Sequence, residues 1–391
     1  MTEGGAALAV PCPACAGGAV RRFLTLPRSV PLLPNVLHTT RDEALAAPRG
    51  TMDLAVCQAC SLVWNVAFEE ELVAYAQGYE NSLHFSGAFQ AYARELASRL
   101  VTQHGLDGRT VVEIGCGGGE FLAMLAEAGA GECRGFDPSF DPARLATLPV
   151  DRVSIEPRAF LPGDAVGADF VCCRHVLEHL ADPGAVLGAL RCSGRTVPGY
   201  LEVPNGACTI RGGAIWDLIY EHPLYFAEAA LWALCERSGL SVAATGTSFG
   251  SQYLWAELRT PVVDAGVRPP DRYADGEVEA FADAFSNTIA TWEGRIAHLG
   301  AAGEVVLWGA GSKGVSFLNL VATARQVRRV IDINPNKHGR FVPGSGHPVV
   351  APGALVAEPP ASVVVMNPLY AQEIEATLAG LGLHPRLELA W

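Results

Sequence analysis

The stretch TVVEIGCGGGEFLAMLAEAGA, residues 110–130, decides the fold class of this chain. It joins a short β-branched strand, a glycine-rich turn and an amphipathic helix, and this is the opening unit of a doubly wound α/β sheet. The following segment, GECRGFDPS (131–139), indicates a second strand that ends at Asp137. Because strands and helices alternate from here on, we expect a ligand to bind at the carboxyl ends of the strands.

Strands and helices are predicted on both sides of this unit. Apolar residues at helical spacing predict helices within 67–105, and one long helix is predicted over 274–300. A second unit of strand, glycine turn and helix follows in EVVLWGAGSKGVSFLNLV (304–321). The remaining strands are predicted in ADFVCCRHVLEHLADP (168–183, which runs on into a loop and a short helix), GYLEVPN (199–205), RRVIDINP (328–335) and ASVVVMNP (361–368).

Length and composition fit several domains of this kind. The 391 residues suggest two or three domains, and a hydrophobic content of 50% allows large cores. We predict a cysteine-rich module at 1–66, a doubly wound domain at 67–245 and a smaller α/β domain at 246–391.

The charge balance and the first residues exclude several classes of protein. The formal net charge of -13 would repel a phosphate backbone, which argues against a nucleic-acid partner. The opening MTEGGAALAVPCPAC does not resemble a signal peptide, and no apolar run reaches membrane-spanning length. We therefore expect a cytoplasmic protein with no membrane partner.

Four of the eleven cysteines form two C-x-x-C pairs, Cys12 with Cys15 and Cys57 with Cys60. Two thiolates from one tight turn can reach the same ion, and two such turns complete a tetrahedral zinc site. Because four thiolates leave no open position, the zinc would be structural. The alternative is two unrelated turns in a reducing cytoplasm.

The first glycine loop, EIGCGGG, lacks the spacing of a dinucleotide fingerprint. It resembles the E/D-x-G-x-G-x-G loop of class I S-adenosylmethionine-dependent methyltransferases. The resemblance implies that Glu113 organises the loop and the cationic methionine end, and that Asp137 holds the ribose hydroxyls. The alternative is an ordinary tight turn. The expected cofactor-binding residues are Glu113, Gly115, Cys116, Gly117, Gly119, Asp137, Pro138 and His175.

The second loop, GAGSKG, does fit G-x-G-x-x-G, and Asp332 ends the next predicted strand. Lys313 within this loop could meet a phosphate at the start of the following helix. Three interpretations stay open: the loop binds a phosphate-bearing part of the substrate, it is structural only, or it binds a dinucleotide.

The three-part layout resembles the nucleotide-sugar C-methyltransferases of deoxysugar biosynthesis. The elements that carry the resemblance are the four paired cysteines, EIGCGGGEF, RHVLEHL, LEVPN, YEHPLYF and WGAGSKG. It implies a zinc module, a central class I methyltransferase domain and a C-terminal Rossmann-like domain. The implied reaction removes the C3 proton of a nucleotide-linked 4-keto sugar and methylates the resulting enolate with S-adenosylmethionine.

This reaction accounts for the acid and base in WDLIYEHPLYF, residues 216–226. Removing a proton beside a ketone needs a base of near-neutral pKa, and His222 suits that role. Glu221 could orient the imidazole or contact the sugar, and Tyr220 is either catalytic or a packing residue. The resemblance adds His179 and Tyr79 to the active site.

RHVLEHL allows a further interpretation. On a helix, His175 and His179 would share a face, as in a metal-binding H-x-x-E-H motif. We favour the methyltransferase interpretation because the stretch follows a strand of the central sheet. Lys313 and Asn205 are the candidate substrate-binding residues, in a monomer or homodimer.

Four other functions remain possible from the sequence. The acceptor could be another small molecule, methylated at carbon, oxygen or nitrogen. The second loop could serve an NAD-linked oxidoreductase. MNPLY (366–370) faintly resembles the N-P-P-Y motif of enzymes that methylate nucleic acids, but Leu369 replaces the second proline. A non-catalytic scaffold would leave Glu113, Asp137 and His222 unexplained.

Overall fold

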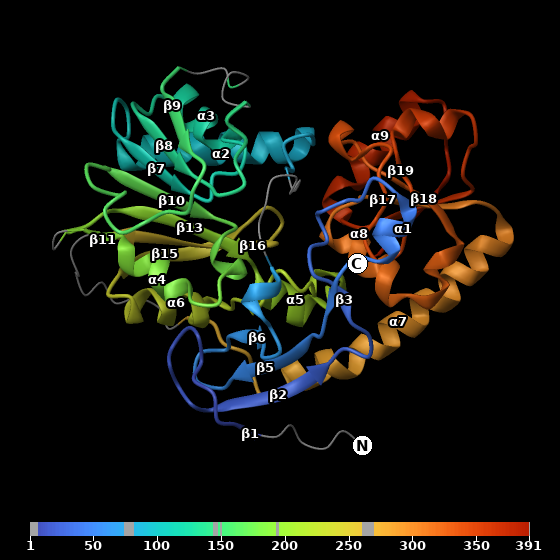
Figure 1. The fold of residues 1–391 in the computed structure, drawn as a ribbon, viewed down its shortest axis with the longest axis horizontal. Coiled ribbons are helices and arrows are strands. Elements are labelled where there is room, and N and C mark those ends of the chain that lie inside the picture. Colours follow the sequence, from blue (N-terminus) through green and yellow to red (C-terminus); the bar gives the residue numbers. More distant parts are fainter. Residues whose placement is uncertain are drawn as a thin grey trace.

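The computed structural model describes residues 7–73, 82–143, 148, 151–192, 195–259 and 270–390 (Figure 1). Tyr79, predicted to be catalytic, lies outside these ranges. The α/β class is confirmed, with two sheets of doubly wound type and a third, antiparallel sheet at the N-terminal end.

The antiparallel sheet is built mostly from the N-terminal segment. Its strands pair in the order β1 (Ala7–Leu8), β2 (Val20–Thr25), β5 (Asp53–Cys57), β6 (Val63–Asn65) and β14 (Leu224–Tyr225). The last strand comes from the centre of the chain, and Leu224 lies opposite Trp64 across the pairing. The predicted module at 1–66 is therefore completed by a segment more than a hundred residues further along.

A long excursion separates β2 from β5. It holds a short ribbon of β3 (Val30–Pro31) and β4 (Arg49–Gly50) and the helix α1 (Arg41–Leu45). A capping box starts this helix, because Thr40 accepts from the backbone N–H of Glu43 and the Glu43 carboxylate accepts from the N–H of Thr40.

The central sheet has seven strands and carries the first glycine loop. In the order in which they pair, the strands are β15 (Ser241–Ser248), β16 (Tyr253–Arg259), β13 (Gly199–Pro204), β10 (Phe170–Arg174), β7 (Val111–Ile114), β8 (Cys133–Phe136) and β9 (Val153–Glu156). The strand β16 alone runs in the opposite direction to the other six. The strand order reverses between β7 and β10, so the ligand crevice of this doubly wound sheet lies at their carboxyl ends.

One predicted domain boundary is wrong. The boundary at residue 245 falls inside β15, and β16 also belongs to the central sheet. The two strands form an antiparallel edge to an otherwise parallel sheet, which mixed sheets commonly carry. The sequence shows no helix between them, so the alternation that identified the earlier strands stops before the sheet is finished.

Helices cover both faces of the central sheet (Figure 1). Alternate residues of one strand face opposite ways: Phe170 and Cys172 of β10 join one core, and Val171 and Cys173 join the other. The first core includes α2 (Gly87–His104) and α3 (Glu120–Glu127), and the second includes α4 (Pro183–Ala189) and α6 (Glu228–Arg237). Of the helical region predicted at 67–105, the described residues form α2 and a single 3₁₀ turn.

The C-terminal domain is a smaller parallel sheet. Its strands pair in the order β19 (Val349–Val350), β18 (Val327–Ile331), β17 (Val305–Trp308), β20 (Ser362–Val365) and β21 (Arg386–Leu389), and its helices are α8 (Ser312–Leu320) and α9 (Ala371–Gly380). The predicted long helix is α7 (Glu277–Ala302), which contacts both β17 and β2. The order reverses between β17 and β20, so a second crevice opens beside the second glycine loop.

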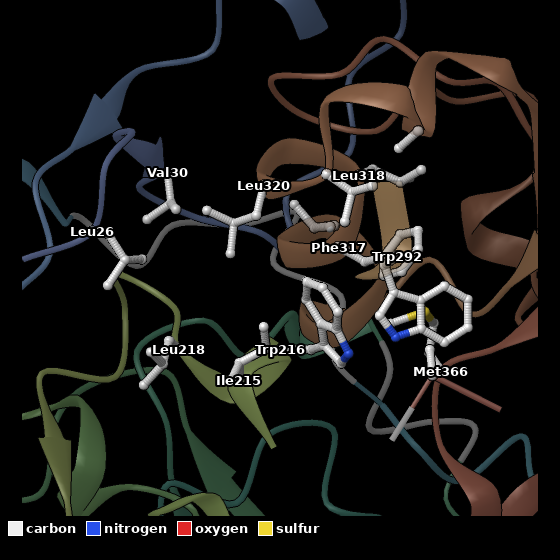
Figure 2. Packing of buried hydrophobic residues seen from close by; sticks show 14 of the residues in the cluster. Leu26, Val30, Ile215, Trp216, Leu218, Trp292, Phe317, Leu318, Leu320 and Met366 are labelled. Atoms are coloured by element: carbon white, nitrogen blue, oxygen red, sulfur yellow. The ribbon is translucent and has the colours of Figure 1, made fainter. Parts of the chain in front are cut away.

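One hydrophobic core joins the N-terminal, central and C-terminal parts (Figure 2). Trp216 precedes β14 in the chain, and its ring lies 4.8 Å from that of Phe317 in α8. Trp292 of α7 packs against the same phenylalanine at 5.3 Å. Each such aromatic pair contributes about 0.5–1.5 kcal/mol beyond its buried area, so this core fixes the position of 216–226.

The remaining regular elements are short. They are the helix α5 (Gly206–Gly212), the ribbon β11 (Arg191–Cys192) with β12 (Arg195–Thr196), and 3₁₀ turns at Glu70–Leu72, Leu177–His179, Ile215–Asp217, Ala322–Gln326, Pro335–Lys337, Pro352–Val356 and Pro368–Tyr370. Within the described residues, every helix is too short or too polar to cross a membrane.

Candidate active site

A cavity of about 320 Å³ lies where the two crevices face each other. The central domain contributes His175, His179 and His222 to its wall, and the C-terminal domain contributes Lys313. Asn35, from the excursion between β2 and β5, lines the same space. Residues from all three parts of the chain therefore meet at one cavity.

His179 and His222 form the centre of the cavity wall. Their ring centroids are 4.5 Å apart and the rings are nearly perpendicular, at 85°. Nδ1 of His179 lies 2.9 Å from the backbone carbonyl oxygen of Glu221. Because a carbonyl can only accept, Nδ1 carries the proton and donates it, and the neutral ring keeps its lone pair on Nε2.

Burial controls the charge of both histidines. Burial lowers the pKa of His222 well below 6.5, and the neighbouring His179, His175 and Lys313 lower it further. Burial also lowers the pKa of His179. Both imidazoles are therefore uncharged at neutral pH, and the pKa of His222 lies below the near-neutral value expected from the sequence.

The side chain of Glu221 points away from the imidazoles. It is fully buried, and its Oε1 accepts from Asn35 Nδ2 at 2.9 Å. Asn35 also donates to Ser312 Oγ, at 3.0 Å, at the start of α8. The backbone carbonyl of Glu221 orients His179 by accepting from its Nδ1–H.

Tyr220 is a packing residue, which corrects its predicted catalytic role. Its ring is fully buried against Phe68, with centroids 5.3 Å apart, and leaves no room for a Cβ at Gly50. Its hydroxyl accepts from the backbone N–H of Glu69 at 2.9 Å. Tyr225 lines the cavity instead, but its hydroxyl is held by the backbone of Ile219.

His175 does not share a helix face with His179, which corrects the predicted i, i+4 pair. Its φ of 55° is left-handed, and only a 3₁₀ turn follows. Its Nε2 lies 3.3 Å from Glu202 and its Nδ1 lies 3.7 Å from Glu178. Burial opposes a charge on His175, but these two carboxylates outweigh it and raise its pKa.

Glu202, inside β13, is a site residue that the sequence analysis missed. It is fully buried and pairs with Arg174 at 3.0 Å, while the hydroxyl of Tyr200 donates to it at 2.8 Å and that of Tyr92 at shorter range. Burial alone would raise its pKa, but Arg174 and His175 hold it low. The sequence does hold a signal for Glu202, which is the acidic residue in the apolar strand LEVPN. A carboxylate buried in such a strand needs polar or charged partners.

The first glycine loop forms a cradle at the end of β7. Gly115, Gly117 and Gly119 all have positive φ. A Cβ at Gly115 would lie 2.2 Å from Val176, whereas nothing lies within 4 Å of one at Gly117, which leaves open space beside the backbone there. The Cys116 side chain points into the core, and Pro138 is exposed at the rim.

The two acids of this loop are arranged differently. Asp137 accepts from the N–H of Gly117 through Oδ2 and from that of Ser139 through Oδ1, both at 2.8 Å. Glu113 is buried, and among the described residues its Oε2 has no hydrogen-bond partner. Burial raises the pKa of Glu113 to about 8, although Arg174 opposes the shift. A cationic ligand group would satisfy this oxygen, so the cradle fits S-adenosylmethionine.

The second glycine loop repeats this design with one difference. Asp332 accepts from the N–H of Ala310 and from that of Asn334, both at 2.8 Å. The ammonium of Lys337, which is 6% exposed, lies 3.6 Å from the same carboxylate. The position where a dinucleotide's ribose would need an acceptor is therefore already neutralised, which disfavours the dinucleotide interpretation.

The two predicted substrate-binding residues both line the cavity. Lys313 is ion-paired with Asp217 near the N-terminal end of α8. The side chain of Asn205 caps α5 by accepting from the N–H of Ala207, and it donates to the carbonyl of Ser251 at 2.9 Å. Asn205 thus shapes the loops around the cavity.

The four paired cysteines converge in the N-terminal module. Sγ of Cys12 lies 3.6 Å from that of Cys60, and Sγ of Cys15 lies 3.6 Å from that of Cys57. All four sulfur atoms lie within 4.8 Å of one another, a set that could hold a metal ion. The neighbouring thiols and burial raise the pKa of Cys60, as expected when several thiols share a site without a cation.

Comparison with known proteins identifies the two α/β domains. Residues 86–245 match the family model of a methyltransferase domain, and residues 268–382 match that of a C-methyltransferase C-terminal domain. The chain is 27% identical over 372 residues to C-methyltransferase NovU of Streptomyces niveus, covering 88% of this chain and 87% of NovU.

Further similarities cover smaller shares of the chain. A ubiquinone biosynthesis O-methyltransferase of Ralstonia nicotianae is 36% identical over 101 residues, which are 24% of this chain and 41% of that enzyme. A solved structure of the Burkholderia thailandensis 1,6-didemethyltoxoflavin N1-methyltransferase with S-adenosylhomocysteine covers 44% of this chain and 80% of its own, with 20% identity and a TM-score of 0.35. The chain is therefore an S-adenosylmethionine-dependent methyltransferase, with a methyltransferase domain at 86–245 and a C-methyltransferase C-terminal domain at 268–382.

Proposed function

We propose that the protein methylates C3 of a nucleotide-linked 4-keto-deoxysugar through an enolate. S-adenosylmethionine, when bound, supplies the methyl group. Two observations support the proposal: the similarity to NovU extends over both α/β domains, and the cavity is lined both by residues that follow β10 and by the second glycine loop. We further propose that the reaction serves the biosynthesis of a secondary metabolite or a surface sugar in the cytoplasm.

The first glycine loop would hold the cofactor. Glu113 would accept from the ammonium group of the methionine part, because its Oε2 is buried and has no partner in the described residues. The backbone of Gly117 would face the cofactor, since the space beside it is open. Asp137 already accepts from two backbone N–H groups and from the Ser139 hydroxyl, and it would accept from the ribose hydroxyls with its remaining lone pairs.

His222 would act as the base, and its position is the observation that carries the proposal. It lines the cavity between the two crevices, and burial keeps it uncharged and able to take a proton. An anionic substrate in the cavity would raise the pKa of His222 and so strengthen it as a base. The imidazolium that forms would stabilise the adjacent enolate charge electrostatically.

The second glycine loop would bind the diphosphate of the sugar nucleotide. Ser312 and Lys313 open α8, whose N-terminal N–H groups favour an anion. Lys313 adds a positive charge on the cavity wall. This arrangement would place the nucleotide on the C-terminal domain and the sugar ring near His222.

A structural zinc ion bound by Cys12, Cys15, Cys57 and Cys60 completes the proposal. Four sulfur donors match the composition of a closed tetrahedral site. Such an ion would stabilise the turn before β2 and the turn after β5 without taking part in the reaction.

The function can be tested by mass spectrometry of products. The purified protein is incubated with S-adenosylmethionine and a panel of nucleotide-linked keto sugars, and a gain of one methyl group is expected on at least one of them. Without the methyl donor, the same sugar should exchange its C3 hydrogen for deuterium in heavy water. The absence of both reactions on every sugar of the panel would falsify the proposal.

The alternative acceptors are tested in the same panel. Phenols and amines added to it would gain a methyl group if the protein methylates oxygen or nitrogen. Such products would not exchange a carbon-bound hydrogen, so the exchange experiment separates these acceptors from a keto sugar.

A further inference from the structure

Three potential metal ligands meet at one point of the cavity wall. A carboxylate oxygen of Glu178 and one ring nitrogen each of His179 and His222 lie within 4.8 Å of one another. The left-handed turn at His175 removes that histidine from the predicted pair with His179, and His222 takes its place. The result is a donor set of two imidazoles and one carboxylate.

The carboxylate of Glu178 is buried at the cavity wall and lies near the imidazole of His175. The residue is 1% exposed, and neither of its oxygens has a hydrogen-bond partner among the described residues. The nearest ion-pair contact, Nδ1 of His175, is 3.7 Å away. Glu178 also lines the cavity, so a ligand can reach it. Because a buried carboxylate without hydrogen-bond donors is costly, and His175 lies beyond hydrogen-bond distance, the site favours a cation.

His179 is already oriented for metal binding. Its Nδ1–H donates to the carbonyl oxygen of Glu221, so its Nε2 carries a lone pair. In metal-binding histidines, the ring nitrogen that does not bind the metal usually donates such a hydrogen bond, and this bond fixes the orientation of the ring. Lys313 lies on the same cavity wall, and its ion pair with Asp217 reduces its repulsion of a cation.

We propose that Glu178, His179 and His222 form a site for Zn²⁺ with a fourth position open to the cavity. Two histidines and one glutamate, with an open position, are a known ligand set of accessible zinc sites. A metal ion would occupy the lone pair with which His222 takes a proton. Resting on the function proposed above, we infer that Zn²⁺ is a reversible inhibitor of the methyl transfer.

Metal binding can be measured without any activity. The full-length protein, with its cysteine site filled by zinc, is titrated with Co²⁺, and visible absorption reports nitrogen and oxygen ligands without a sulfur charge-transfer band. One saturable equivalent is expected. Glu178→Gln and His222→Asn should each weaken it by at least about tenfold. The control, His298→Gln, changes an exposed histidine of α7 and should bind Co²⁺ as the unaltered protein does.

Two results would overturn the site. One is the absence of a saturable Co²⁺ equivalent beyond the cysteine site, and the other is unchanged affinity in both Glu178→Gln and His222→Asn. Circular dichroism and the Tm of each variant identify a variant that fails to fold. If Glu178→Gln fails, the decision falls to His222→Asn, whose residue lies at the cavity surface.

The inhibition is tested separately, with each variant compared to its own rate without metal. Zn²⁺ should inhibit the unaltered protein, a chelator should reverse it, and Glu178→Gln should need at least about tenfold more Zn²⁺. Methylation that persists with Co²⁺ or Zn²⁺ bound would refute the inhibition. Metal binding with the predicted ligand dependence, in a protein that methylates no keto sugar, would support the metal site and reject the proposed function.

Discussion

Tyr220 and His222 are two positions apart, and we predict opposite outcomes for their substitution. Tyr220→Phe removes a hydroxyl whose described contact is the backbone N–H of Glu69. A neutral hydrogen bond of this kind contributes about 1 kcal/mol to the free energy of unfolding, and Glu69 is exposed, so water can replace the lost acceptor. The variant should be about 1 kcal/mol less stable, with kcat/KM unchanged.

His222→Asn should do the reverse. It removes a base from the cavity wall, and a positioned base is worth about 10²–10⁴-fold in rate, or roughly 3–5 kcal/mol of activation free energy. The affinity for S-adenosylmethionine should stay within about twofold, because His222 lies outside the glycine loop, and a twofold change corresponds to less than about 0.5 kcal/mol.

Three measurements on each variant decide the matter. These are denaturant unfolding, kcat/KM for the methylated sugar, and titration calorimetry with S-adenosylmethionine. A hundredfold loss of kcat/KM in Tyr220→Phe at nearly normal stability would show that Tyr220 acts in catalysis and that its buried position is misread. Full activity in His222→Asn would remove His222 from the role of base.

Four further outcomes are expected. Because burial lowers the pKa of His222 well below 6.5, kcat/KM should stay level as the pH falls to 6.5 and should decline only at lower pH. A decline centred above pH 6.5 in a pH–rate profile would contradict the role of His222 as the base. Burial raises the pKa of Glu113 from 4.5 to about 8, so the protonated side chain contributes to stability fully below pH 4.5, and this contribution is lost as the pH rises towards 8. At pH 8, Glu113→Gln should therefore have a higher Tm than the unaltered protein. The same variant should bind S-adenosylmethionine more weakly by calorimetry. Cys57→Ser should lose the zinc ion in metal analysis and lower the Tm, since zinc contributes on the order of 10 kcal/mol to isolated zinc modules; an unchanged metal content would argue against the site. Lys313→Ala should raise KM for the sugar nucleotide about tenfold while the affinity for S-adenosylmethionine stays constant, and equal losses of both would indicate a structural role.

Local patterns made much of the fold predictable. The unit at 110–130 forms β7, the glycine turn and α3 as predicted, because the β-branched run, the positive-φ glycines and the helical apolar spacing agree with one another. The strand and helix at 304–321 follow for the same reason. The edge strands β15 and β16 were misassigned because no helix separates them, and the sequence alone does not say which sheet they complete.

The site was only partly predictable, for a different reason. His222 and His179 come together as the family resemblance implied, but they are far apart in the sequence and only the fold brings them to one cavity. The sequence left both a catalytic and a packing role open for Tyr220, because it does not show that the tyrosine hydroxyl accepts from the backbone N–H of Glu69. Glu178 was quoted within RHVLEHL without a role, since only its burial without a described partner reveals it.

The pairing of β14 with β6 has a consequence for engineering this enzyme. His222 lies two residues before Leu224, whose strand is the last of the antiparallel sheet, next to β6, the strand that follows Cys60. Grafting a foreign cysteine module onto this catalytic core would therefore leave the proposed base attached to a mismatched edge. A working chimera would have to exchange 1–66 together with 216–226, because these two segments are far apart in the sequence but contribute strands to the same sheet.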